Sequence, residues 1–121
     1  MISRDEIYSQ LAQIALSDFA DIAEATTPIE IKDFSKGWEF YRYLAFDKEK
    51  GVYAYHWERK NIDGTTYRYN NLPDKEAKRL QTYPKHFHNK TEENVEESDL
   101  SDNPEQAIRT VLEFARQIIK S

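Results

Sequence analysis

The stretch VYAYHWERKNIDGTTYRYNN, residues 52–71, decides the fold, because aromatic and polar residues alternate on both sides of a single turn. Alternation of this kind is typical of antiparallel strands that bury one face. We predict strands over residues 52–60 and 65–71, joined by Asn61-Ile62-Asp63-Gly64. These four residues suit a type I turn followed by Gly64 in the left-handed conformation, which forms a three-residue loop with a bulge.

The turn also predicts how the two strands pair and which side chains share a face. In the predicted register, Arg59 faces Tyr67, Glu58 faces Arg68, Trp57 faces Tyr69 and His56 faces Asn70. Successive residues of a strand point to opposite faces of the sheet. One face therefore carries the aromatic residues Tyr53, Tyr55, Trp57, Tyr67 and Tyr69, and the other carries His56, Glu58, Arg68 and Asn70. We expect the aromatic face to be buried and the polar face to carry any chemistry.

Helical patterns flank the predicted sheet at both ends of the chain. The first begins with the capping box Ser3-Arg4-Asp5-Glu6 and continues to about residue 17, with its apolar face formed by Ile7, Leu11, Ile14 and Ala15. The second begins at Asn103-Pro104-Glu105-Gln106, where Asn103 is the N-cap and Gln106 completes a capping box. Its apolar stripe comprises Ala107, Ile108, Val111, Leu112, Ala115, Ile118 and Ile119.

The segments between these elements complete the predicted fold. Residues 29–31 and 38–46 indicate two further strands joined near residues 33–37, and residues 83–88 resume a strand-like pattern. Residues 72–82 indicate a loop or a short exposed helix, and the six acidic residues within 92–102 indicate a solvated connecting loop. We therefore predict one α+β domain, residues 1–121, in which a twisted antiparallel sheet of four or five strands is packed by an N-terminal and a C-terminal helix.

Composition excludes several classes of protein. The chain has 121 residues, a formal charge of −5 and no cysteine, which excludes a disulfide framework, a thiolate nucleophile and a Cys-based zinc site. It has neither the apolar core of a signal peptide nor a membrane-length apolar run, so we expect a cytoplasmic protein without membrane contact. Glycine-rich phosphate loops and the G-x-S-x-G and H-E-x-x-H motifs are also missing from the sequence.

The polar face of the hairpin and His86-Phe87-His88 hold the groups best suited to catalysis. His86 and His88 are two residues apart, so they share a face on a strand, and imidazole titrates near neutral pH. We predict that His86 and His88 act as acid and base, that Arg68 binds a phosphate, and that His56 or Glu58 orients them. These groups suffice for metal-independent cleavage of RNA, for which we expect no cofactor and no metal ion.

Basic and amide side chains near these groups indicate where a substrate would bind. The chain is locally basic around the two histidines through Lys75, Lys78, Arg79, Lys85 and Lys90, although such a run is also typical of a plain solvated face. We expect the substrate to be bound by Asn70, Asn71, Lys85 and Arg79.

Three other interpretations stay open on the residues alone. The polar face suits an ordinary solvated surface with a cross-strand ion pair between Glu58 and Arg68. The His-x-His pair is also half of a metal site, and Glu58 or His56 could supply the third ligand of a metal-dependent hydrolase. Finally, the chain could be a noncatalytic module that regulates a protein partner, which exposed Tyr and Trp side chains on the hairpin would favour.

Three segments carry a family resemblance: Tyr53-Ala54-Tyr55-His56-Trp57, Arg68-Tyr69-Asn70-Asn71-Leu72-Pro73 and Tyr83-Pro84-Lys85-His86-Phe87-His88. Together with the sequence up to about residue 119, they resemble a small prokaryotic family of TumE-type toxins, also called DUF6516. This sequence departs from the family pattern at two positions. Asn70 stands where the family usually has Asp, so a catalytic or metal-binding role of that Asp would be altered here, and Lys85 interrupts a doubled His found in many relatives.

The resemblance implies a growth-inhibiting toxin of a toxin–antitoxin system, partnered by a DNA-binding antitoxin. It does not imply a target for the toxin. The choice of RNA as substrate and of an endoribonuclease as the activity comes from the chemistry of the His and Arg residues. Self-association into a homo-oligomer stays open.

Overall fold

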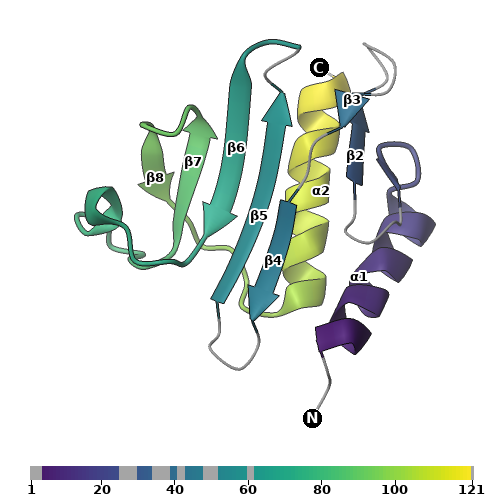
Figure 1. Ribbon diagram of the computed structural model, residues 1–121, viewed down its shortest axis with the longest axis horizontal. Coiled ribbons are helices and arrows are strands. Elements are labelled where there is room, and N and C mark those ends of the chain that lie inside the picture. The colour runs from purple at the N-terminus through teal and green to yellow at the C-terminus, as the bar shows by residue number, and fades with distance from the viewer. Residues whose placement is uncertain are drawn as a thin grey trace.

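The computed structural model describes residues 4–24, 30–33, 39–40, 43–47, 52–59 and 62–120 (Figure 1). Its helices are α1 (Arg4–Asp18), the short 3₁₀ helix η2 (Lys75–Ala77) and α2 (Pro104–Lys120). Its strands are β1 (Ala23–Glu24), β2 (Glu30–Asp33), β3 (Glu39–Phe40), β4 (Tyr43–Asp47), β5 (Val52–Arg59), β6 (Thr65–Asn70), β7 (His86–Lys90) and β8 (Val95–Glu97). The predicted α+β class is confirmed, because an antiparallel sheet is packed by an N-terminal and a C-terminal helix.

Five strands form the main antiparallel sheet in the order β4-β5-β6-β7-β8, so each strand pairs with its neighbour in the sequence. The last strand, β8, lies inside the acidic segment that we predicted to be a connecting loop, and that prediction was wrong for Val95–Glu97. Val95 is buried with Ala77 and Leu80 beneath the η2 segment, which fixes this short strand against β7. A single valine among acidic residues is too weak a pattern to predict a strand.

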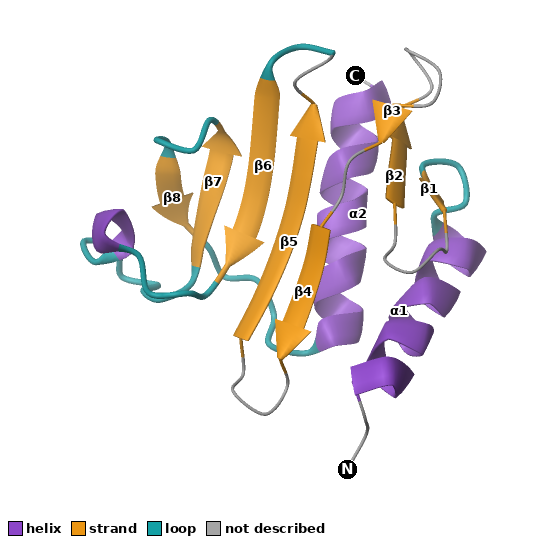
Figure 2. Ribbon diagram, in the orientation of Figure 1, coloured by secondary structure: helices purple, strands orange, loops and turns teal. Residues whose placement is uncertain are grey.

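A smaller antiparallel sheet, in the order β1-β2-β3, adjoins α1 (Figure 2). The strand predicted over residues 38–46 is in fact divided, since β3 pairs with β2 in the small sheet while β4 pairs with β5 in the large one. Apolar alternation continues through such a change of partner, so the sequence pattern cannot reveal it. The joint predicted near residues 33–37 lies, after Asp33, outside the described residues, as does Ser3 of the first capping box.

The central hairpin keeps the predicted faces but not the predicted register. Arg59 pairs with Thr65 and not with Tyr67, a displacement of two residues, so the pairing of β5 with β6 ends at Arg59 and Thr65. The Arg59 carbonyl accepts hydrogen bonds from the amides of Ile62, Asp63 and Gly64, which makes the turn wider than predicted. Gly64 has a φ of 80°, the left-handed conformation that we predicted. A displacement by an even number of residues leaves every side chain on its predicted face.

The aromatic face of the large sheet is buried under α2, and α1 packs beside α2 (Figure 2). Phe114 of α2 meets the rings of Tyr67 and Phe87 edge-on, with centroid separations of 5.0 and 5.5 Å. Tyr69 stacks on Phe87 at 4.2 Å. Each such aromatic pair contributes about 0.5–1.5 kcal/mol beyond the area that it buries. The helices therefore cover the aromatic face of the sheet, and connections between strands lie at the opposite, polar face.

The start of α2 is capped largely as predicted. The side-chain oxygen of Asn103 accepts a hydrogen bond from the Gln106 amide at 3.1 Å, which confirms Asn103 as the N-cap. The Gln106 side chain does not close a capping box on Asn103, however, because it accepts a hydrogen bond from the Ser101 hydroxyl at 2.9 Å. The Asn103 amide donates to that same hydroxyl at 3.0 Å. Ser101 thus takes the place that the sequence pattern assigned to Gln106.

Arg116 of α2 joins the two helices through the turn that follows α1. Its guanidinium donates to both carboxylate oxygens of Asp21, at 3.1 and 2.9 Å, and lies 4.5 Å from the ring centroid of Phe19. The hydrogen bonds from Arg116 hold the pKa of Asp21 well below its usual range, against a smaller opposing effect of burial. Lys120 adds a second cation at 2.7 Å from the same carboxylate.

This contact predicts a stability effect that depends on pH. Asp21→Asn should lower the free energy of unfolding by about 1 kcal/mol at pH 7, a discounted figure because the carboxylate is 36% exposed. Since folding depresses the pKa of Asp21, its contribution is complete above the unfolded-state pKa of about 4 and is lost as pH falls towards the folded-state value. Urea unfolding of both proteins at pH 7 and pH 3 measures this. Glu113→Gln, which removes a more exposed partner of Arg116, is the control. The prediction would be contradicted if the difference in free energy of unfolding between the wild type and Asp21→Asn were the same at pH 3 as at pH 7.

Candidate functional site

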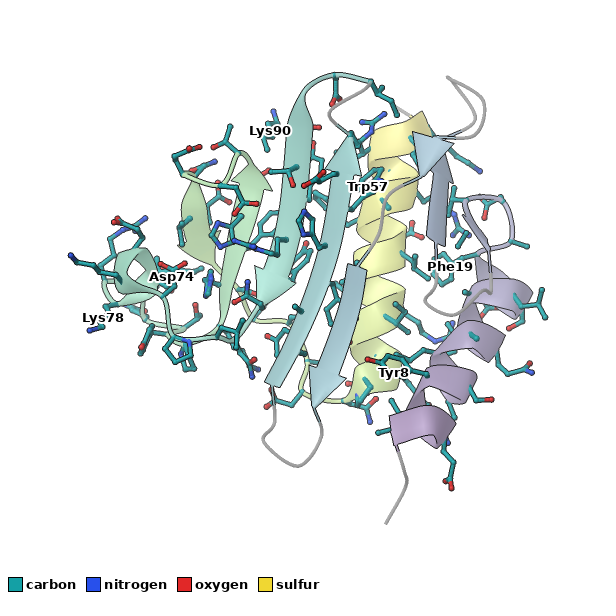
Figure 3. All side chains as sticks on the ribbon, viewed as in Figure 1. Tyr8, Phe19, Trp57, Asp74, Lys78 and Lys90 are labelled. Carbon is teal, nitrogen blue, oxygen red and sulfur yellow. The ribbon has the colours of Figure 1, made fainter. Side chains whose placement is uncertain are left out.

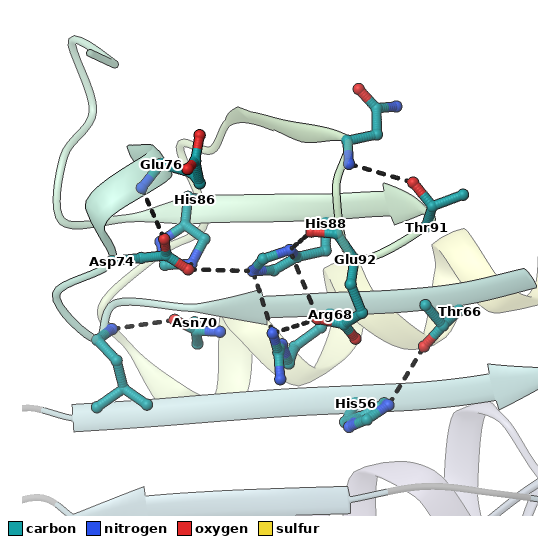
Figure 4. Close-up of polar contacts among 12 residues, drawn as sticks. His56, Thr66, Arg68, Asn70, Asp74, Glu76, His86, His88, Thr91 and Glu92 are labelled. Atoms are coloured by element: carbon teal, nitrogen blue, oxygen red, sulfur yellow. Dashed lines mark hydrogen bonds and ion pairs between the residues drawn. The ribbon is translucent and has the colours of Figure 1, made fainter. Parts of the chain in front are cut away.

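The polar face of the large sheet gathers the candidate residues into rows that cross the strands. Directly paired residues of antiparallel strands point to the same face. His56 of β5 pairs with Arg68 of β6, and Arg68 pairs in turn with His88 of β7. In the next row, Asn70 pairs with His86. The sheet therefore places both histidines of β7 on the face that carries His56 and Arg68, as Figure 4 shows.

The two histidine rings of β7 are held in one tautomer by backbone carbonyls. Nδ1 of His86 lies 2.8 Å from the Pro84 carbonyl oxygen, and Nδ1 of His88 lies 2.8 Å from the Glu92 carbonyl oxygen. A carbonyl only accepts hydrogen bonds, so each Nδ1 carries a proton and donates it. In a neutral ring the lone pair is then on Nε2. His86 is 1% exposed and His88 is 2% exposed, so both residues are buried within the site.

Asp74 lies on the segment that connects β6 with β7 (Figure 3) and faces these two Nε2 atoms (Figure 4). One oxygen of its carboxylate caps η2 by accepting a hydrogen bond from the Glu76 amide at 2.8 Å. The other oxygen lies 3.8 Å from Nε2 of His86 and 3.9 Å from Nε2 of His88. The three side chains offer ligand atoms that all lie within 4.8 Å of one another, an arrangement that can hold a metal ion.

Arg68 occupies the solvent side of this cluster. Its Nη2 lies 3.3 Å from Nε2 of His88 and also contacts the carboxylate of Glu92. Burial lowers the pKa of the His88 ring; the hydrogen bond to the Glu92 carbonyl opposes this, and the positive charge of Arg68 adds to the lowering. His88 is therefore neutral at pH 7, which agrees with the tautomer that its hydrogen bonds require.

His56 lies on the other side of Arg68, one strand away. Its Nε2 is 3.2 Å from the Thr66 hydroxyl oxygen and 3.3 Å from Oε1 of Glu58. Burial lowers the pKa of His56, while the negative charge of Glu58 raises it. The predicted pairing of Glu58 with Arg68 was wrong, because the displaced register sets Glu58 opposite Thr66 and sets His56 opposite Arg68.

The predicted substrate-binding residues are not brought together. Asn70 is buried beside His86 and accepts a hydrogen bond from the Leu72 amide. The side chain of Asn71 accepts from the Tyr53 amide, and Arg79 donates to the Val95 carbonyl at 2.7 Å. Lys85 donates to the Leu100 carbonyl at 2.8 Å and pairs with Asp102. Asn71, Arg79 and Lys85 thus support the chain around the site, and only Asn70 lies on the polar face.

Asp74 and Glu92 are the site residues that sequence reasoning missed. Both lie in connections, one after β6 and the other between β7 and β8, and neither has a fixed spacing from the His-x-His pair. The available signal was the turn sequence Leu72-Pro73-Asp74, directly after a strand that carries Arg68 and Asn70. Asp is a typical helix N-cap, and Asp74 is the N-cap of η2. The pattern located the turn but could not show that the turn folds back over β7.

These features define a small α+β protein with a His, Arg and Asp cluster on the open face of a five-stranded antiparallel sheet. The model of a family described as Toxin TumE matches residues 13–119, and the chain belongs to this family. It therefore has a toxin role, which in general implies an antitoxin partner. The searches of curated proteins and of solved structures each found no match. Within the described residues, every helix is too short or too polar to cross a membrane.

Proposed function

We propose that this toxin is an endoribonuclease and that the row His56–Arg68–His88 forms its active site. The observation that carries the proposal is the position of Arg68, whose pairing partners on the two adjacent strands are both imidazoles. Adjacent strands lie about 5 Å apart. A guanidinium binds phosphate oxygens well, and an imidazole on either side can supply a base and an acid. RNA is the favoured substrate class because its own 2′-hydroxyl serves as the nucleophile.

In this proposal His88 is the general base. Its Nε2 carries a lone pair on the side of Arg68, and its lowered pKa keeps the ring neutral at pH 7. Nε2 takes the proton of the ribose 2′-hydroxyl as the 2′-oxygen attacks the adjacent phosphorus. Arg68 binds the phosphate oxygens on which negative charge develops in the transition state. A free imidazole performs this step without a metal ion.

His56 is the general acid on the opposite side of the phosphate. Burial lowers the pKa of His56, and the carboxylate of Glu58, 3.3 Å from its Nε2, opposes this effect and favours the protonated ring. His56 gives its proton to the 5′-oxygen as the bond from phosphorus to that oxygen breaks, and the products are a 2′,3′-cyclic phosphate and a 5′-hydroxyl. This assignment revises the sequence-based pairing of His86 with His88, because His88 pairs with Arg68 and lies 3.3 Å from its Nη2, whereas His86 pairs with Asn70 in the next row. His86 instead supports the site from within, beside Asp74.

Mapping the ends of cleaved RNA tests the proposed function. Purified toxin should cut RNA oligonucleotides and leave a 2′,3′-cyclic phosphate and a 5′-hydroxyl, both of which are distinguishable by end labelling and mass spectrometry. Cleavage that leaves a 5′-phosphate would exclude attack by the 2′-hydroxyl. RNA that stays intact with a toxin that still arrests growth would overturn the ribonuclease assignment as a whole.

The proposed partner is a DNA-binding antitoxin, as the resemblance seen in the sequence implies, and RNA is the proposed target. Coexpression with the product of the adjacent gene should suppress toxicity. Light scattering of the complex measures its stoichiometry and any self-association.

The alternative of a noncatalytic binding module depended on exposed aromatic side chains. It has lost that support, because Tyr53, Tyr55, Trp57 and Tyr67 are all buried.

A further inference from the structure

We infer that Asp74, His86 and His88 bind one divalent transition-metal ion, for which Zn²⁺ is the best-matched ion. The metal site depends only on the geometry of the chain. Its catalytic consequence, that the ion generates the base for cleavage, rests on the proposed ribonuclease function.

The ligand atoms already surround one point. The free oxygen of Asp74 lies 3.8 and 3.9 Å from the Nε2 atoms of His86 and His88, and all three ligand atoms lie within 4.8 Å of one another. Ligands of a tetrahedral Zn²⁺ ion, at bond lengths of about 2.1 Å, are separated by about 3.4 Å. Small rotations of the three side chains would therefore close the site around an ion without moving the backbone of the sheet.

The buried Nε2 of His86 is the strongest single indication. This atom makes no hydrogen bond within the described part of the chain, although the ring is 1% exposed. Buried polar atoms are nearly always satisfied, so an exception calls for an explanation. The Pro84 carbonyl fixes Nδ1 as a protonated nitrogen, so in the neutral ring the unsatisfied Nε2 carries a lone pair that faces the Asp74 carboxylate. A metal ion satisfies an imidazole nitrogen and a carboxylate oxygen together.

The groups around the three ligands have the arrangement that metal sites use to orient them. Metal-binding histidines usually donate their other ring N–H to a carbonyl or carboxylate. Here His86 donates to the Pro84 carbonyl and His88 to the Glu92 carbonyl, both at 2.8 Å. The Glu76 amide holds the second oxygen of Asp74 at 2.8 Å. All three ligands are thus fixed by backbone groups, with the remaining donor atom of each directed inward.

Arg68 is a positive charge beside the ligands, and it competes with an ion for the lone pair of His88. Its Nη2 lies 3.3 Å from that Nε2, while Glu92 balances its charge. When an ion occupies Nε2, Arg68 keeps Glu92 as its partner and can turn to a phosphate. This competition predicts that Arg68→Ala retains or tightens metal binding while it abolishes phosphate binding. The same variant therefore separates the metal site from the proposed catalysis.

The ligand set selects the ion and leaves room for chemistry. Two imidazoles and one carboxylate favour Zn²⁺ and similar transition metals over Ca²⁺ and Mg²⁺, which prefer oxygen ligands. Three protein ligands leave a coordination position for water, which is the pattern of catalytic zinc sites. A bound hydroxide would take the proton of the 2′-hydroxyl and become bound water, in place of the free Nε2 of His88. The attacking oxygen, the leaving oxygen and the products stay the same.

The test is a titration of the metal-free, untagged full-length chain with Co²⁺ and Zn²⁺. We expect one Co²⁺ per chain, with the visible absorption bands of a tetrahedral or five-coordinate site of nitrogen and oxygen ligands. Zn²⁺ should displace the Co²⁺, and calorimetry measures this displacement. Asp74→Asn should weaken binding at least 100-fold, and asparagine keeps the N-cap of η2. Glu105→Gln, an acidic position at the start of α2, is the control and should bind as the wild type does.

Each outcome decides between the two proposals. A wild-type chain that binds neither ion above the level of Asp74→Asn overturns the metal site, whatever the RNA assay shows. Should Asp74→Asn fail to fold, the stoichiometry and the rise in melting temperature of the wild type with Zn²⁺ still decide. Metal binding without RNA cleavage overturns the ribonuclease alone. Metal binding with RNA cleavage that persists at full rate in chelator overturns the catalytic role of the ion and leaves the metal-free mechanism.

Discussion

Replacing Arg68 with alanine is expected to lower the rate of RNA cleavage about 10²- to 10³-fold, the usual effect of removing a group that stabilises transition-state charge. Arg68 is 30% exposed and makes its contacts with Glu92 and His88 at the surface of the sheet, so its loss should leave the core unchanged. Arg68→Lys should give an intermediate rate, because lysine keeps the charge but cannot bind a phosphate through two parallel hydrogen bonds. Single-turnover cleavage of an RNA oligonucleotide measures both variants.

Two controls separate phosphate binding from other effects of the substitution. Glu92→Gln breaks the ion pair of Arg68 but keeps the guanidinium, so its rate should stay within a few-fold of the wild type. Arg109→Ala removes an arginine that pairs with Asp18 on the helical side of the molecule and should not change cleavage. Full activity of Arg68→Ala, with melting temperatures matched across the set, would remove Arg68 from the active site.

Local patterns were sufficient to predict most of the fold. The spacing of Ile7, Leu11, Ile14 and Ala15 predicted α1, and the alternation within residues 52–71 predicted the central hairpin and its two faces. Both signals depend on burial of one face of one element, which a sequence records directly. The register was wrong because it depends on the width of a turn. That width is set by hydrogen bonds of the Arg59 carbonyl, and residue types report these only weakly.

The candidate site was predicted in part, for a related physical reason. His56, Arg68, His86 and His88 were expected together because strand periodicity alone assigns each of them to a face. Asp74 could not be assigned in this way, since its position depends on how residues 71–85 fold over the sheet. That path is fixed by the packing of Ala77 and Leu80, which lie between β6 and β7, on Val95 of β8, and this contact has no periodic signal in the sequence. The same contact explains why the short strand β8 was missed.

Replacing His56 with alanine is expected to slow RNA cleavage by about 10²- to 10⁴-fold, the usual contribution of a general acid. His56 is not among the three residues whose ligand atoms group together, Asp74, His86 and His88, so the variant should retain the ion that they bind. The distinguishing measurement is a substrate with a leaving group that needs no proton, such as a ribonucleotide 3′-p-nitrophenyl phosphate. His56→Ala should cleave that substrate at close to the wild-type rate, whereas Arg68→Ala should not. An equal loss on both substrates would make His56 a structural residue.

The pH dependence gives the same assignment an independent check. A general acid works only when protonated, so cleavage should fall as pH rises through the pKa of His56. Burial is the largest effect on the pKa of this ring and lowers it; among the residues that the structure describes, Glu58 and Glu92 raise the pKa and Arg68 lowers it. Glu58→Gln removes a raising effect, so the fall in rate should begin at a lower pH than in the wild type. Because the Glu58 carboxylate lies 3.3 Å from Nε2 of His56, its removal should affect this limb more than Glu92→Gln does. If the fall in rate at high pH begins at the same pH in Glu58→Gln as in the wild type, or if it is still present in His56→Ala, the general acid is another group.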